Sequence, residues 1–126
     1  MSDCPCGRSL PYARCCGPCV EDFPGRPAPD AEALMRSRYS AFVLERADYL
    51  LATWHESKRP SKISFDPGVK WLGLEVRDFK VVDEAHAEVE FVARQRDRSG
   101  RAVRLHERSR FVREEGRWYY VEGDWL

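Results

Sequence analysis

The sequence predicts an α+β fold in which two helices pack on a curved, four-stranded antiparallel sheet, preceded by a short cysteine-bearing knuckle. Three observations support this prediction. Apolar residues recur at helical spacing after residue 30, four strand-like runs follow one another from residue 70, and all five cysteines fall before residue 20 of the 126-residue chain. We therefore expect a knuckle at residues 1–19, a proline-rich connector at 20–29 and an α+β body at 30–126.

The composition is that of a globular protein. Hydrophobic residues make up 43% of the chain, which is enough for one core, and the formal net charge of zero argues against nucleic acid as a partner. The first residues form no apolar leader, and no run approaches the roughly 18 apolar residues of a membrane span. These features predict a cytoplasmic protein with no membrane segment. In a reducing cytosol, clustered cysteines are metal ligands more often than disulfides.

The cysteines are paired in the sequence. Cys4 and Cys6 flank one proline, eight residues follow, and Cys15 and Cys16 are adjacent. This spacing lets one small loop wrap a soft metal ion, and four thiolates fill the tetrahedral coordination of Zn²⁺. We expect one structural zinc ion per chain, because a catalytic zinc keeps one position open.

The fourth zinc ligand has two candidates. Cys15 completes the set if the adjacent pair ligates, whereas Cys19 completes it if Cys16-x-x-Cys19 is the second pair. Two alternatives to a structural zinc site remain at this point. The cysteines could be reduced without binding metal, or the knuckle could be a redox-responsive zinc module in which Cys19 is a spare thiol.

The segments after the knuckle read as connector, helices and loop. Residues 17–29 hold four prolines and two glycines and predict a stiff, extended connector. Asp30 is a good N-cap, and the apolar stripe after it predicts a helix over 30–46. A second stripe after a new cap at Asp48 predicts a helix over 48–55, followed by a polar loop to residue 70.

Four strands joined by short turns predict an antiparallel meander. In the first strand the alternation changes parity near Arg77 and Asp78, which predicts a β-bulge there. Long bulged strands curl, so helices across the hollow side would enclose a cone with a pocket. The predicted strands are residues 70–82, 85–96, 101–114 and 117–124.

Charge is unevenly distributed over the predicted sheet. Residues 94–117 contain nine arginines, and residues 75–90 contain six acidic side chains. Cross-strand ion pairs are the expected explanation, and a basic hairpin that docks an acidic partner is the alternative.

One carboxylate lies on the apolar side of its strand. Glu107 has the parity of Leu105 and Ser109, so we expect it to face the helices, where an unpaired charge is costly. Either an ion pair fixes helix to sheet there, or the residues line a pocket that binds a small molecule or performs acid–base chemistry. The candidate neighbours are Arg36, Arg38, Tyr39, Trp54, His55, Trp118 and Tyr120.

The cysteine pattern resembles the SEC-C motif, the zinc knuckle at the tail of the SecA translocation ATPase. The resemblance implies zinc ligation by Cys4, Cys6, Cys15 and Cys16, with Cys19 outside the pattern. Arg8 departs from the motif, which usually continues with serine after the glycine at position 7.

The remainder of the chain resembles the YchJ family of small bacterial proteins. The resemblance implies a nuclear-transport-factor-2-like (NTF2-like) cone, in agreement with the bulged sheet, and it implies no particular activity. It extends over residues 34–42, 47–50, 53–55, 71–74, 107–111 and 116–120.

These features predict a zinc-binding protein-interaction or scaffold module, because the SEC-C knuckle that it resembles serves partner binding. The second hypothesis is a small-molecule binder or enzyme that uses the pocket around Glu107. The third is the redox-responsive zinc module. No reaction is assigned, and a non-catalytic role is favoured.

Overall fold

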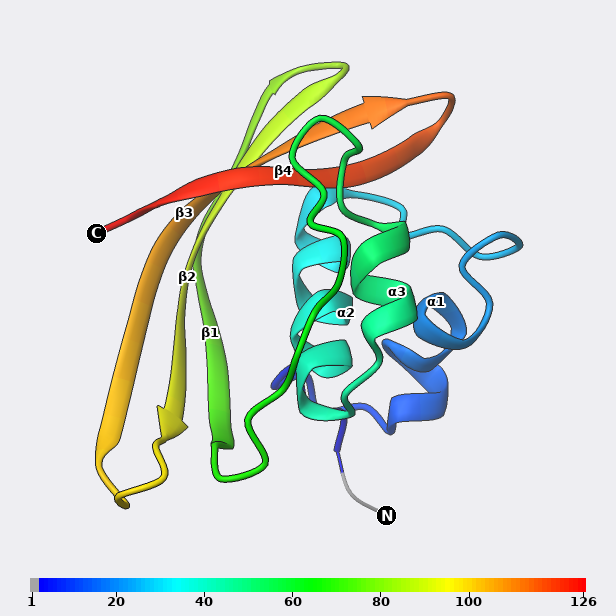
Figure 1. The fold of residues 1–126 in the computed structure, drawn as a ribbon. Helices are drawn as coiled ribbons and strands as arrows, with labels where there is room; N and C mark the ends of the chain where they lie inside the picture. Colours follow the sequence, from blue (N-terminus) through cyan, green and yellow to red (C-terminus); the bar gives the residue numbers. More distant parts are fainter. Residues whose placement is uncertain (1–2) are drawn as a thin grey trace.

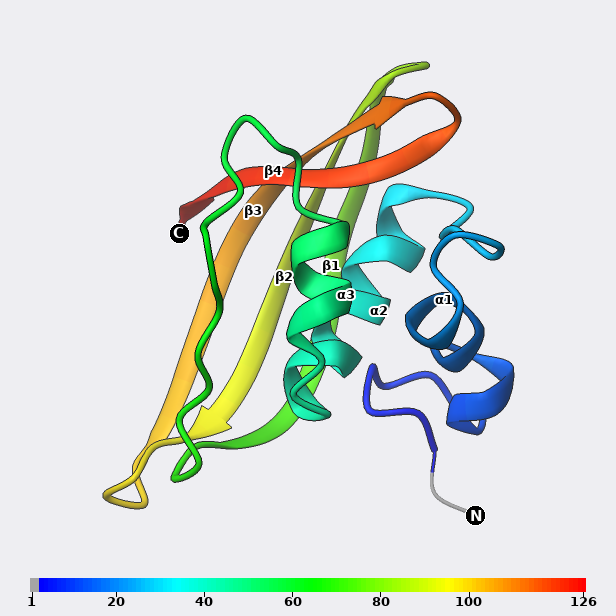
Figure 2. The same cartoon turned by 45° about the vertical axis from the view of Figure 1, so that its right-hand side comes forward.

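The computed structural model describes residues 3–126. The four strands form one antiparallel sheet in the order β1-β2-β3-β4, and the predicted α+β cone is confirmed. Figures 1 and 2 show three layers: the curved sheet, helices α2 and α3 on its concave side, and the N-terminal segment behind these helices. The elements are η1 (Tyr12–Arg14), α1 (Gly17–Glu21), α2 (Ala31–Val43), α3 (Ala47–Ala52), β1 (Lys70–Asp83), β2 (His86–Arg96), β3 (Ala102–Glu114) and β4 (Arg117–Trp125).

Local interactions determine where helices α2 and α3 begin and end. The Asp30 carboxylate accepts a hydrogen bond from Ala33 N at 2.7 Å, which confirms the predicted N-cap of α2. The helix ends at Val43, before the expected residue 46, because the chain turns at Glu45 with a positive φ of 56°. The expected cap at Asp48 is wrong: this residue lies in the first turn of α3.

The connector is not extended over its whole predicted length. Residues 17–21 form α1, with Pro18 in the first turn, where its missing N–H costs no hydrogen bond. Val20 of α1 is buried in the same core as Leu34 of α2. The division of the chain at residues 19 and 29 stays a prediction, although both sides contribute to one core.

Bulges give the sheet its curvature. The register between β1 and β2 shifts between Val76 and Asp78, which confirms the predicted bulge, and further shifts occur elsewhere in β1. The β3–β4 register shifts beside Phe111. The concave face carries the side chains that pack against α2 and α3, namely Ala87, Val89, Phe91, Ala93, Ser109 and Phe111.

Cross-strand ion pairs explain much of the uneven charge. The Arg108 guanidinium contacts Glu88 at 2.9 Å, Glu90 at 3.4 Å and Asp78 at 2.9 Å, which joins three strands. The expected charge pairing is confirmed at this position. None of the helices within residues 3–126 has the length and hydropathy that crossing a bilayer requires.

Candidate metal centre and ligand cavity

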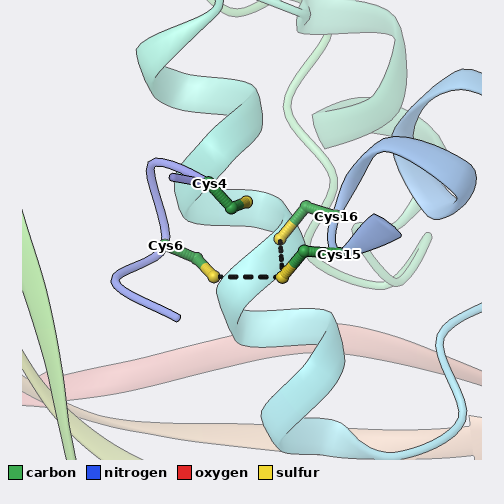
Figure 3. A group of neighbouring side chains, drawn as sticks. All are labelled: Cys4, Cys6, Cys15 and Cys16. Carbon is green, nitrogen blue, oxygen red and sulfur yellow. Dashed lines mark hydrogen bonds between the residues drawn. The ribbon is translucent and has the colours of Figure 1, made fainter. Parts of the chain in front are cut away.

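The N-terminal knuckle brings four sulfur atoms together. The Sγ atoms of Cys4, Cys6, Cys15 and Cys16 all lie within 4.8 Å of one another (Figure 3). Neighbouring sulfurs are 3.5 Å apart for Cys6–Cys15 and 4.0 Å apart for Cys15–Cys16. Four thiolates at about 2.3 Å from Zn²⁺ would be separated by about 3.8 Å in a tetrahedron. The cluster is therefore compatible with a metal site, and Cys19 is not part of it.

Two tight turns position these sulfurs. Gly7 adopts a positive φ of 94°, which favours glycine, and its N–H donates to the Cys4 carbonyl at 3.2 Å. The first turn thereby aims Cys4 and Cys6 at the same point. The second pair follows η1, where Cys15 N donates to the Tyr12 carbonyl at 3.0 Å.

The cluster is packed against α2. Cys4, Cys6 and Cys16 are buried, and Cys4 Sγ lies 3.5 Å from Ser40 Oγ. Arg36 Nη1 donates to the Cys6 carbonyl at 3.0 Å. Arg36, which the sequence grouped with Glu107, therefore belongs to the interface between the knuckle and α2.

The thiols of the cluster differ in acidity. Hydrogen bonding with Cys16 lowers the pKa of Cys6 below that of an ordinary thiol. The same hydrogen bond, together with burial, raises the pKa of Cys16, and burial raises the pKa of Cys15. Without a cation, two of the sulfurs, those of Cys15 and Cys16, therefore resist ionisation. A bound dication would stabilise the remaining thiolates, as thiolate ligation requires.

A cavity lies between α2 and the concave face of the sheet. It consists of two adjoining parts of about 230 Å³ and about 250 Å³, whose walls share Met35, Phe42, Phe91, Glu107 and Trp125. The Arg38 half is completed by Arg38, Trp54, Ser109 and Tyr120. The Trp71 half is completed by Tyr39, Trp71, Ala93 and Leu105.

Glu107 faces this cavity, as its strand parity predicted. Its Oε2 accepts hydrogen bonds from the Ser109 hydroxyl and from the Tyr120 hydroxyl, the latter at 3.2 Å. Its Oε1 accepts none from the described residues. The one fully enclosed side-chain polar atom without a partner in these residues is Trp54 Nε1, so Glu107 Oε1 is not fully enclosed.

A glycine makes room for this carboxylate. Gly123 lies opposite Ser109 in the β3–β4 pairing. A Cβ at position 123 would lie 2.6 Å from Glu107 Cδ, far inside the contact distance. Because Gly123 has no side chain, the Glu107 carboxylate lies directly against the backbone of β4.

Arg38 is the second charged group of the cavity and is 4% exposed. Its Nη1 donates to the Leu50 carbonyl at 2.8 Å and to Thr53 Oγ1 at 2.7 Å. Its Cζ lies 5.2 Å from the centroid of the Trp54 ring and 4.7 Å from that of Tyr120. Burial lowers the pKa of Arg38 to about 10, which leaves the guanidinium charged at neutral pH.

The expected pocket constellation is thus only partly assembled. Arg38 and Glu107 line one cavity but form no ion pair in the described structure. His55 lies elsewhere: its Nε2 contacts Glu114 at 2.9 Å and its Nδ1 contacts Ser57 Oγ at 2.7 Å. Trp118 packs on the core without lining the cavity. Tyr39, Trp54 and Tyr120 line the cavity.

Sequence reasoning missed several aromatic walls of the cavity. Phe42, in the last turn of α2, and Trp71, near the start of β1, were not among the predicted pocket residues. Both could have been found from their positions at element ends facing the hollow. Trp125 gave no such signal, because it lies opposite Glu107 only through the β3–β4 bulge, and its side chain remains 68% exposed.

Comparison with known proteins identifies the family. The family described as "YchJ, middle NTF2-like domain" matches residues 30–123. A UPF0225 protein of Polaromonas sp. is 68% identical over 127 residues, which cover 96% of this chain and 91% of the relative. A UPF0225 protein of Bordetella pertussis is 57% identical over 122 residues, which cover 96% of this chain and 91% of the relative.

Two solved structures have the same fold. The solution structure of a SEC-C motif containing protein from Rhodopseudomonas palustris has a TM-score of 0.86 at 35% identity and covers 99% of both chains. The crystal structure of a SEC-C motif containing protein from Psychrobacter arcticus has a TM-score of 0.80 at 29% identity, covering 97% of this chain and 81% of the other. The chain therefore belongs to the YchJ family of UPF0225 proteins, in which an NTF2-like domain carries this fold.

Proposed function

We propose that this protein binds a small organic molecule in the cavity between α2 and the sheet, and that a structural zinc ion supports the cavity wall from behind. One observation carries the proposal. Glu107 and Arg38 are both buried in the wall of an aromatic hollow, yet they form no direct ion pair with each other. A buried charge without a counterion is costly, so a ligand that pairs with it would be bound favourably.

The structural zinc is the second part of the proposal. Cys4, Cys6, Cys15 and Cys16 have the donor chemistry and the spacing for one Zn²⁺ per chain, and two solved relatives in fold are named for the SEC-C motif. Reduced thiolate ligands suit a reducing compartment, so we place the protein in the cytoplasm.

Native mass spectrometry tests the zinc assignment. Wild-type protein is expected to carry one zinc ion, Cys6→Ser to lose it, and Cys19→Ser to retain it, because Cys19 lies outside the cluster. Metal-free wild-type protein, or loss of the metal in Cys19→Ser, would contradict this ligand set.

A role of the knuckle in partner binding receives less support from the geometry. Three of the four cysteines are buried, and the knuckle is packed against α2. What remains for a protein partner is the outer turn with Arg8 and Leu10, both exposed. Compared with this exposed turn, the cavity combines charged and aromatic side chains, so it is the better supported binding site.

A fragment screen followed by ¹H–¹⁵N correlation spectra tests the cavity. Bound fragments are expected to shift amides of the cavity wall, such as those of Met35 and Phe91. Ala93→Phe should abolish these shifts, since its new ring would occupy the Trp71 half.

The matched control for the cavity test is Val81→Phe, which adds a ring at an exposed position. This variant should bind fragments as wild type does. Equal binding to Ala93→Phe, or shifts confined to amides outside the cavity, would contradict the proposal.

A further inference from the structure

The convex face of the sheet carries rows of charged side chains that run across the strands. Figures 1 and 2 show α2 and α3 on the concave side, and no helix of residues 3–126 covers the convex side. In the middle rows, His106 Nε2 lies 2.8 Å from Glu90 Oε2. Farther along β3, Arg110 Nη1 lies 2.8 Å from Asp124 Oδ2. With the contacts of Arg108 described above, the charges of these rows are balanced within the chain.

The two rows nearest the β2–β3 turn are different. Lys70 lies directly opposite Arg96, and Arg94 lies directly opposite Arg104. Side chains of opposite residues point to the same side of a sheet, with Cβ atoms about 4.5 to 5.5 Å apart, so like charges there repel each other. All four side chains belong to exposed residues, and none forms an ion pair with any of residues 3–126. We call Lys70, Arg94, Arg96 and Arg104 the basic patch.

Acidic side chains beside the basic patch have partners of their own. Glu75, in the next row, contacts Arg77 at 3.0 Å. Asp97, in the β2–β3 turn, accepts hydrogen bonds from Ser99 N at 2.9 Å and from Arg101 N at 3.0 Å. The positive charge of the basic patch is therefore available to a molecule outside the chain.

The spacing of the basic patch fits an extended acidic peptide. Arg94 and Arg96 are two residues apart on β2, which corresponds to about 6.8 Å, and alternate side chains of an extended peptide have the same spacing. A guanidinium donates two parallel hydrogen bonds to a carboxylate, which makes arginine well suited to this pairing. Leu72, in the β1 bulge between the two rows, is 51% exposed and offers an apolar contact.

A nucleic acid strand fits the basic patch less well. Proteins that bind single strands add aromatic side chains on which the bases stack, and the rows of the basic patch contain none, since the neighbouring Trp71 lines the cavity on the other side of the sheet. The rows that follow contain Glu75, Asp78 and Glu90, so a long polyanion would meet carboxylates. The anionic part of the partner is therefore short.

We infer that the basic patch is a docking surface for an extended acidic segment of another protein, whose alternate aspartate or glutamate side chains pair with these arginines. The basic patch lies on the opposite face of the sheet from the cavity, so the proposed function does not depend on it. Charge complementarity supplies the attraction, and it relieves the repulsion between the opposed cations.

Three labelled probes test this surface by fluorescence anisotropy at low salt. The first is a peptide of four Glu-Thr repeats, the second is its neutral counterpart of four Gln-Thr repeats, and the third is a twelve-nucleotide oligothymidylate. Each is titrated into wild type, the patch variant Arg94→Gln/Arg104→Gln and the control Arg26→Gln/Arg113→Gln. The control removes the same charge from two exposed arginines that have no ion pair within residues 3–126.

Wild type and the control are expected to bind the Glu-Thr peptide at least about 10-fold more tightly than the Gln-Thr peptide. The patch variant should weaken the Glu-Thr peptide by about 10-fold, because it loses two of the arginine–carboxylate pairs. Its unfolding temperature should equal or exceed that of wild type, since two like charges are removed. In wild type, the peptide should shift amides of residues 70–73, 94–96 and 102–104, a readout that needs no variant.

Equal binding of the two peptides to wild type would overturn the inference, as would an equal loss in the control or shifts confined to other strands. Tighter binding of the oligothymidylate than of the Glu-Thr peptide would also overturn it, and would assign the basic patch to nucleic acid instead.

Discussion

Removal of the metal from the knuckle is expected to lower the free energy of unfolding by about 5 kcal/mol and to release the knuckle from α2. This is about half of the roughly 10 kcal/mol that structural zinc contributes to a small module that folds only with its metal, because the cone retains a core of its own. The effect should extend beyond the knuckle, since Cys4, Cys6, Cys16 and Val20 belong to the same core as α2.

The physical reason is that the knuckle has little else to hold it. Its two helical turns are η1 and the five-residue α1, and neither is stable alone. Without a dication, burial and mutual hydrogen bonding keep Cys15 and Cys16 protonated, so the four sulfurs lose their common partner. The contacts that remain, such as Arg36 to the Cys6 carbonyl at 3.0 Å, are too few to order the loop.

Urea unfolding with and without a zinc chelator measures this loss, and amide spectra locate it. We expect large shifts at residues 4–20 and at the facing side of α2, and small shifts at the β2–β3 hairpin. Cys6→Ser should reproduce the chelated state, and Cys19→Ser should behave as wild type. An unchanged unfolding midpoint after complete removal of zinc would contradict the structural role.

Strand parity was the most informative signal in the sequence. The period of two placed Phe91, Glu107 and Ser109 on the concave face, and the parity change in β1 located its bulge between Val76 and Asp78. These predictions succeeded because a strand buried on one face cannot shift by one residue without exposing its apolar side.

The end of β4 shows why the cavity could not be predicted completely. A regular pairing from the Glu114–Arg117 turn would place Asp124 opposite Glu107, but the bulge beside Phe111 places Trp125 there instead. One inserted residue thus replaces a carboxylate by an aromatic ring in the cavity wall. The first seven residues of β4 are uniformly half-buried, so this strand shows no parity change that reveals the bulge.

The sequence predicted which charged residues are buried better than it predicted which of them lie close together. Arg36 and Arg38 are two residues apart on α2 and therefore point in different directions, Arg36 to the knuckle and Arg38 to the cavity. The sequence assigned both to Glu107 because the position of the knuckle behind α2 was unknown. Residues 17–21 were predicted as extended for the same reason, since Val20 is helical where it packs on that helix.

Replacement of Arg38 by methionine is expected to destabilise the protein by about 3 kcal/mol, the largest effect we predict for a single residue outside the knuckle. The methionine fills similar space but cannot donate to the Leu50 carbonyl or to Thr53 Oγ1. The Leu50 carbonyl lies near the end of α3, where carbonyl groups have no partner within the helix. The guanidinium therefore caps α3 and joins it to α2.

Arg38→Lys separates the contribution of the charge from that of the planar group. Lysine can keep one hydrogen bond but cannot cover the Trp54 and Tyr120 rings as the guanidinium does, so we expect a loss of about 1 to 2 kcal/mol. Urea unfolding followed by circular dichroism measures both variants. Arg77→Met is the matched control: this arginine is exposed and pairs with Glu75, so its loss should remain below about 0.5 kcal/mol. If Arg38→Met were as stable as this control, the guanidinium would have no role in holding α3, and its burial beside Glu107 would have to be explained by the ligand alone.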